Sequence, residues 1–371
     1  MFIEIDGSVA SASGLDVREA LEVLGLASVY GHHFVTATPA ALRSAIAAHG
    51  PRGRAFEGLK RASGGAREVT MSALLPVWIR AEGGLDYPVQ QTTGAGTVLR
   101  VPVEHFASGR ALRPSVLIGE NYWDTSLLLA MGKAYLAAQP LKNIQLSLDE
   151  VLGGGSTTAA VYDRHQSDVT PCLVVVDSDR GYPGAPEGDV AQAVRAVDDQ
   201  ARLHAAYRVL PVRSSENAVP HALIEDPASS DPGVRDALDQ HRRIALSSSA
   251  DVLAWTDMKG GTPLALTDPG LTDANTAAYW ATHRSTLTAD LGTTAVPARC
   301  SGGCSVGAIR ECECVAVRGF GPKLLERLGS SFQETGGHGL LKNLDARTEP
   351  VWMDIGGWVA AWGLARRPLQ V

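Results

Sequence analysis

Three strongly apolar segments, each followed by acidic residues, most constrain how this chain can fold. They are the strand-like runs PSVLIGE, CLVVVDSD and RVLPVRSSEN, which end at Glu120, at Asp177 and Asp179, and at Glu216. A carboxylate at the end of a buried strand is costly unless something compensates its charge. Repeated three times, the pattern indicates several carboxylates gathered at one edge of a sheet, with a divalent metal ion as the compensating charge.

The segments between these runs complete a repeating βα pattern. Apolar side chains recur at helical spacing in residues 121–139, and Pro140 ends that helix. The Gly-rich turn 153–157 opens a second helix, residues 190–206 form a third, and IQLSLDEV supplies a further strand. This order predicts a parallel sheet with right-handed crossovers. Sites in such sheets lie beyond the carboxyl ends of the strands, where the acidic residues fall.

We therefore expect a central, Rossmann-like α/β domain at residues 111–228. An α/β region, residues 1–110, precedes it, with helices at 16–27 (N-capped by Asp16) and 37–50 (between Thr38 and Gly50). Residues 229–371 are expected to be mostly helical, after a linker that begins near residue 227. The tryptophan-rich segment 351–365 is expected to be a buried core helix.

The charge balance excludes a globally basic nucleic-acid-binding protein, because the net charge is −7. A local basic patch is still compatible with this charge balance, since residues 51–67 are rich in Arg and Lys. They form either a solvated helix face or a phosphate-binding patch. No apolar run approaches the roughly 20 residues that span a bilayer, and the first residues lack a signal-peptide core. We expect a cytoplasmic protein that does not enter a membrane.

The acidic residues are spaced as metal ligands would be. Glu120 and Asp124 are four residues apart, across a strand end and the first turn of a helix. Asp177 and Asp179 are two apart and would share one face of a strand. A set of carboxylates without His or Cys favours Mg²⁺ or Mn²⁺ over Zn²⁺. The alternative is that these residues are helix caps and surface turns.

Three neighbouring features are weaker candidates. The backbone N–H groups of Gly154, Gly155 and Ser156 could bind a phosphate at a helix N-terminus, or form only a tight turn. Arg180 follows the D-x-D directly and could neutralise a phosphate. Lys259, in TDMKGG, could reach the site as an electrostatic stabiliser, although a surface turn is the simpler interpretation.

Four of the five cysteines lie together and are candidate ligands for a structural Zn²⁺ ion. They are Cys300, Cys304, Cys312 and Cys314. Four thiolates complete a tetrahedral site and leave no open position, so such a zinc ion would be structural. The alternative is four free thiols. Cys172, at the start of a strand, is expected to be a core residue.

The succession IGENYWD, GGGST, VVVDSDR and SSENAVP resembles a Toprim domain, as found in topoisomerases, bacterial primases and OLD-type nucleases. The resemblance covers residues 114–226 and is closest to the OLD-type and related bacterial defence nucleases. It implies Glu120, Asp124, Asp177 and Asp179 as Mg²⁺ ligands. Glu216 would hold or orient a second ion or the attacking water. One departure is Asn121, where many Toprim sequences have Gly.

The function that this resemblance implies is a Mg²⁺-dependent nuclease, with a role in anti-phage defence. The alternatives are a primase-like phosphotransfer enzyme and a non-catalytic binding or effector subunit. The expected partner is nucleic acid, and we also expect a homo-oligomer. The chain lacks the P-loop pattern GxxxxGK[ST], so an ATPase or a sensor would have to be a separate protein.

Overall fold

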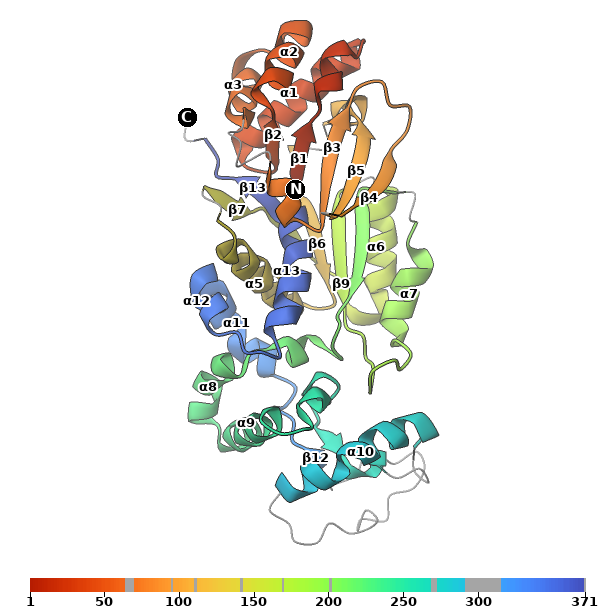
Figure 1. Cartoon of the computed structure of the whole chain (residues 1–371), viewed down its shortest axis with the longest axis vertical. Coiled ribbons are helices and arrows are strands. Elements are labelled where there is room, and N and C mark those ends of the chain that lie inside the picture. The colour runs from red at the N-terminus through yellow and green to blue at the C-terminus, as the bar shows by residue number, and fades with distance from the viewer. Residues whose placement is uncertain are drawn as a thin grey trace.

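The computed structural model describes residues 1–63, 70–94, 96–109, 112–140, 143–168, 170–199, 202–267, 272–290 and 315–369. It is a mixed α/β protein in which a C-terminal helix contacts both of the larger sheets (Figure 1). The prediction of an α/β fold with a parallel sheet is confirmed.

The central sheet has the strand order β10-β9-β6-β8, and every pair in it is parallel. Helices α5 and α13 contact one face of the sheet, and α6 and α7 contact the other. The elements are β6 (Ser115–Gly119), α5 (Tyr122–Ala138), β8 (Leu148–Leu152), α6 (Thr158–Ser167), β9 (Cys172–Val176), α7 (Asp189–Val197), β10 (Ala205–Val209) and α13 (Glu349–Gly363).

Alternate residues of the central strands enter different hydrophobic clusters. Leu117 and Leu173 pack in the cluster that contains residues of α5 and α13. Their strand neighbours Ile118, Cys172 and Val174 pack with residues of α6 and α7. A strand that is buried on both faces must be almost wholly apolar, as β6 and β9 are.

The N-terminal sheet has the order β2-β1-β3-β5-β4, parallel except for the hairpin of β4 and β5. Helix α2 begins and ends as the sequence predicts, because Thr38 caps it and Gly50 adopts a left-handed conformation with φ 59°. The elements are β1 (Phe2–Ile5), α1 (Leu15–Tyr30), β2 (Phe34–Ala37), α2 (Pro39–His49), α3 (Gly53–Ala62), β3 (Val77–Glu82), β4 (Val89–Thr93) and β5 (Gly96–Pro102).

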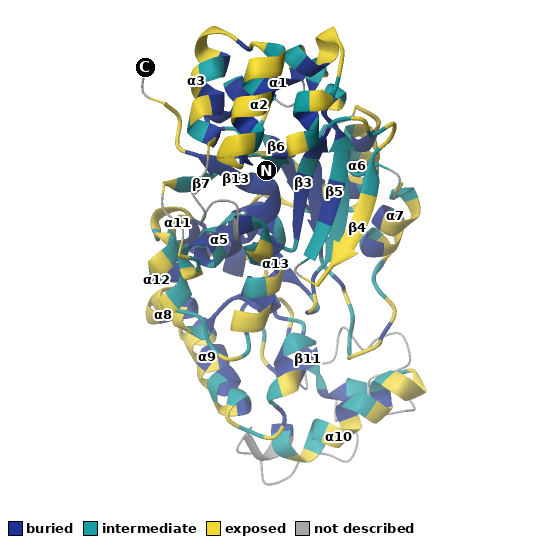
Figure 2. Ribbon diagram, turned by 45° about the horizontal axis from the view of Figure 1, so that its top comes forward, coloured by how far each residue is buried: buried dark blue, intermediate teal, exposed yellow. Residues whose placement is uncertain are grey.

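Helix α13 joins the two sheets into one core. It packs along α5 and also contacts β1 and β3 of the N-terminal sheet and β6 and β9 of the central sheet. Trp352 and Trp362 are buried, so the prediction of a buried core helix is confirmed. Figure 2 shows α13 as largely buried, whereas the edge strand β4 is exposed. After α13 the chain forms β13 (Leu364–Arg366), antiparallel to β7 (Ile144–Leu146).

The remaining C-terminal part lies beyond the carboxyl edge of the central sheet (Figure 1). It has a cluster of its own around Trp280 and Leu253, and α11 and α12 return to pack on α5. The elements are α8 (His221–Ser230), α9 (Pro232–Ala245), β11 (Thr262–Pro263), α10 (Ala274–Asp290), β12 (Val315–Val317), α11 (Leu324–Glu334) and α12 (Gly337–Lys342).

Several predicted boundaries were wrong. The expected linker near residue 227 is helix α8, which tolerates Pro227 because Leu223 and Ile224 are buried on it. Gly14 caps α1, and Asp16 lies inside the first turn. The helix expected at 190–206 ends at Val197, because residues 205–209 form strand β10.

We expect Gly356→Ala to destabilise the protein by about 1–3 kcal/mol, although alanine is the better helix former. A Cβ at this position would lie 2.5 Å from the backbone oxygen of Met131 and would push α13 away from α5. Denaturant unfolding measures the change. The control is Gly94→Ala, whose Cβ would meet nothing within 4 Å. Equal stabilities of the two variants would contradict the close helix contact.

Candidate functional site: a carboxylate cluster at the sheet edge

The structure brings the ends of three neighbouring strands together at one edge. Glu120 directly follows β6, Asp177 directly follows β9, and Glu216 lies in the short 3-10 segment Ser215–Ala218 after β10. β9 pairs with both β6 and β10, so its carboxyl end stands between the other two. The predicted gathering of acidic residues at this edge is therefore present for these three residues.

Asp177 is hydrogen-bonded to both neighbouring strand ends. Its backbone N–H donates to Oε1 of Glu120 over 2.9 Å. Its own Oδ1 accepts from the backbone N–H and the hydroxyl of Ser215, over 2.9 Å and 3.0 Å. These contacts place Glu120 and Asp177 next to each other, as a site shared by the two residues requires.

Asp124 is both a helix cap and a member of the cluster. Its carboxylate accepts from the backbone N–H of Asn121 over 3.1 Å, while the Asn121 side chain accepts from the N–H of Asp124, which completes a capping box. The residue is only 4% exposed. Burial, together with the negative charges of Glu216 and Glu120, raises the pKa of Asp124 to about 7.

Glu216 is buried against a cation from the C-terminal part of the chain. Its Oε2 accepts from the Ser214 hydroxyl over 2.9 Å, and its Oε1 lies 3.2 Å from Nζ of Lys259. Lys259 stands in a turn that the Asp257 carboxylate closes by accepting two backbone N–H groups. Burial lowers the pKa of Lys259, but the surrounding carboxylates outweigh this and raise it, so the ammonium stays charged.

Asp177 and Glu120, at two of the strand ends, both have raised pKa values. Burial, Asp124 and Glu120 hold the pKa of Asp177 well above its ordinary value. Burial also raises the pKa of Glu120, with Asp179 and Glu216 adding to the effect. Carboxyl groups that raise one another's pKa in this way lie within electrostatic range of each other and lack sufficient positive charge.

Asp179 lies near this group but outside its hydrogen-bond network. β9 ends at Val176, so Asp177 and Asp179 do not share a strand face, and that expectation was wrong. Asp179 is exposed and adopts a left-handed φ of 53°. Gly188 makes room for it, because a Cβ there would lie 2.5 Å from the Asp179 side chain. The negative charge of Asp179 still contributes to the raised pKa of Glu120.

The Gly-rich turn holds the backbone of Glu120. The N–H groups of Gly154 and Gly155 donate to the backbone oxygen of Glu120 over 2.9 Å and 3.2 Å. Two of the three groups expected to bind a phosphate are thus engaged in positioning a site residue, while Ser156 is exposed beside them. Arg180 is also engaged, since it donates to Glu187 over 2.8 Å.

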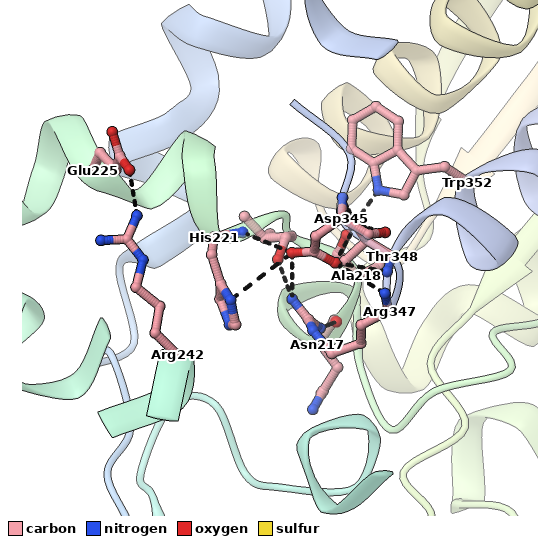
Figure 3. Close-up of polar contacts among 10 residues, drawn as sticks. Asn217, Ala218, His221, Glu225, Arg242, Asp345, Arg347, Thr348 and Trp352 are labelled. Carbon is pink, nitrogen blue, oxygen red and sulfur yellow. Dashed lines mark hydrogen bonds and ion pairs between the residues drawn. The ribbon is translucent and has the colours of Figure 1, made fainter. Parts of the chain in front are cut away.

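A polar anchor holds the segment that carries Glu216. Asn217 donates to the backbone oxygens of Leu253 and Thr256 over 2.8 Å and 2.9 Å. Figure 3 shows Arg347 and Trp352 converging on the same segment: Arg347 donates to Asn217 and to Val219, and the Trp352 indole donates to Ala218 over 2.7 Å. Residues before and within α13 therefore fix the position of Glu216.

Sequence reasoning gave no individual role to Ser214, Ser215 and Asn217, and it preferred a surface turn for Lys259 over the electrostatic stabiliser that it also considered. The capping pattern of Ser214 with Asn217, three residues apart, was the available signal. No local signal marks the approach of Lys259, because tertiary packing brings its turn to the sheet edge.

Two further predictions concern the cysteines and the basic segment. The four clustered cysteines, Cys300, Cys304, Cys312 and Cys314, fall outside the described residues. Of the basic segment 51–67, residues 53–62 form α3, which lies at the opposite end of the molecule from α8 and α9 (Figure 1). In the described ranges, no helix is long and apolar enough to cross a membrane.

No protein-family model, curated protein or solved structure matches this chain. The chemistry of the site therefore has to be argued from its own residues. Among the residues that the structure describes, no three His, Cys, Asp or Glu side chains are grouped so that they could hold a metal ion. Each strand-end carboxylate instead contacts a protein donor. The donor atoms of the cluster are all oxygen, which is the ligand type that hard divalent cations prefer.

We expect Asp177→Asn to raise the stability of the metal-free protein at pH 8 by about 1–4 kcal/mol, because it removes a partly buried, repelled charge and keeps the shape of the side chain. Mg²⁺ should raise the melting temperature of the wild type but not that of the variant. Thermal unfolding with EDTA and with Mg²⁺ tests both statements. The control is Asp163→Asn, on the exposed face of α6. A destabilised Asp177→Asn protein would contradict the electrostatic argument.

The metal-free protein should also lose stability as the pH rises from 5 to 8. The Asp124 pKa lies near 7 in the folded protein and near 4 when unfolded, so between these values the folded state holds the extra proton. The unfolding free energy then falls with pH by up to about 1.4 kcal/mol per unit. Denaturant unfolding in EDTA gives this slope, which Asp124→Asn should reduce. An unchanged slope would assign the effect to other groups.

Proposed function

We propose that this protein is a metal-dependent nuclease of the Toprim type, which hydrolyses phosphodiester bonds of nucleic acid with Mg²⁺ or Mn²⁺. The observation that carries the proposal is the convergence of Glu120, Asp124, Asp177 and Glu216 at the carboxyl edge of a parallel sheet, with raised pKa values at three of them. Such strain favours binding of a divalent cation, which would relieve it.

In this proposal Glu120, Asp124, Asp177 and Asp179 hold the metal, and Glu216 holds a second ion or orients the attacking water. When bound, such ions lower the pKa of water and stabilise the leaving oxygen. Ser215 fixes Asp177, and Ser214 fixes Glu216, through the hydrogen bonds described above. The charged ammonium of Lys259, about half exposed, supplies positive charge for a phosphate at the open side of the cluster.

The same proposal includes a role in bacterial defence, a separate ATPase or sensor as partner, a homo-oligomeric state and a structural zinc ion on the four cysteines. They rest on the resemblance and on the cysteine spacing alone.

We expect purified protein to cleave DNA or RNA with Mg²⁺ or Mn²⁺, and Asp177→Asn to reduce the rate at least about 100-fold. The reason is that losing one anchoring carboxylate removes several kcal/mol of transition-state stabilisation. Gel assays on plasmid, linear and single-stranded substrates measure cleavage, and Asp163→Asn, purified in parallel, should keep the wild-type rate. Cleavage that persists in Asp177→Asn would identify a contaminant. A wild type that cuts nothing with either metal would favour the non-catalytic binding subunit.

A further inference from the structure

The loop that follows Asp179 is a preformed structure. Residues Tyr182–Ala185 make a tight turn in which the Ala185 N–H donates to the Tyr182 oxygen over 3.1 Å. Pro183 occupies its second position, and Gly184, with φ 78°, the third, as in a type II turn. This turn fixes the backbone of Tyr182 three residues beyond Asp179.

The same loop is attached to helix α10. The indole N–H of Trp280 donates to the backbone oxygen of Gly181 over 3.0 Å, and Trp280 is only 1% exposed. At its other end the loop is closed by a hydrogen bond from the Gly188 N–H to the Ser178 oxygen, over 2.9 Å. The loop therefore has a defined position relative to both β9 and α10.

An aromatic pair forms where the loop meets the helix. The rings of Tyr182 and Tyr279 have centroids 6.0 Å apart and planes inclined by 30°. The Tyr279 hydroxyl donates to Asp251 over 3.1 Å, and its ring also contacts Trp280 and His283. Both tyrosines are half-buried, so each residue keeps some solvent-accessible surface.

One member of the pair lies close in sequence to Asp179, whose charge acts on Glu120 of the carboxylate cluster. Tyr182 is the third residue after Asp179, which limits the distance between their Cα atoms to about 10 Å even for an extended chain. That reach is comparable to the size of a nucleotide. A strand whose phosphate lies at the cluster can therefore place a nearby base on Tyr182.

We propose that Tyr182 and Tyr279 form a stacking platform for bases of single-stranded nucleic acid, and that the carboxylate cluster acts on single strands or on unpaired ends. This inference rests on the proposed function and specifies its substrate. Bases in a duplex are covered by their neighbours, whereas the unstacked bases of a single strand can pack on aromatic side chains. Such stacking is worth about 1–3 kcal/mol per base and tolerates any sequence.

The test compares Tyr182→Leu with Tyr182→Phe in the otherwise unchanged protein, on probes with phosphorothioate linkages that resist cleavage. The leucine removes the aromatic face, whereas the phenylalanine keeps it. The probes are a labelled single-stranded oligonucleotide containing 2-aminopurine and its duplex, each with Mg²⁺. Tyr87→Leu, at a 68% exposed tyrosine between β3 and β4, is the matched control.

We expect Tyr182→Leu to bind the single strand roughly 5- to 100-fold more weakly, and to lose the 2-aminopurine quenching that stacking produces. Tyr182→Phe and the Tyr87→Leu control should bind like the parent, and affinity for the duplex should not change. Thermal unfolding checks that each variant is folded.

Failure of the stacking platform and failure of the nuclease proposal give different results. If the wild type cleaves nucleic acid but Tyr182→Leu binds single strands like its parent, the stacking platform is overturned and the nuclease proposal stands. Equal losses for single strand and duplex would also overturn it, because they indicate a general contact with the backbone. If the wild type neither binds nor cleaves nucleic acid with Mg²⁺ or Mn²⁺, both proposals fall.

Discussion

The repulsion among buried and partly buried carboxyl groups at the edge of the central sheet is the constraint on which the rest of this site depends. Glu120, Asp124 and Asp177 each have a raised pKa, since burial and neighbouring charges disfavour their ionised forms. Such an arrangement costs stability, so the surrounding structure has to hold it in place. Ser215 holds Asp177, Asn121 pairs with Asp124, and Lys259 pairs with Glu216.

These supports come from distant parts of the chain. The Glu216 segment is held from the C-terminal side by Arg347, whose neighbour Asp345 also accepts from the His221 N–H. Burial raises the pKa of Asp345, but the charge of Arg347 and the bonds from Thr348 outweigh it and lower the pKa. The carboxylate cluster is thus assembled from the central sheet and stabilised by the C-terminal part, which makes the two parts one structural unit.

The sequence was sufficient for the parts of the fold that local physics determines. The apolar runs of β6 and β9 and the capped helix α2 were predicted because strand burial and helix caps have short sequence signatures. For the site, the sequence predicted only which strand ends carry acidic groups. The left-handed turn at Asp179 depends on Gly188, and the contact of Lys259 with Glu216 depends on packing between distant segments. Helix α8 forms where Pro227 suggested a linker, since burial outweighs local propensity.

Helix α13 has a consequence for the order in which this protein folds. It contacts two sheets whose strands all lie earlier in the chain, and its partner α5 comes more than two hundred residues before it. Contacts of such sequence separation form slowly, because a long loop must close first. During synthesis the face of β6 and β9 that packs in the cluster with α5 and α13 is therefore covered completely only when α13 emerges. The carboxylate cluster, whose Glu216 segment is bound by Arg347 and Trp352, is completed only then.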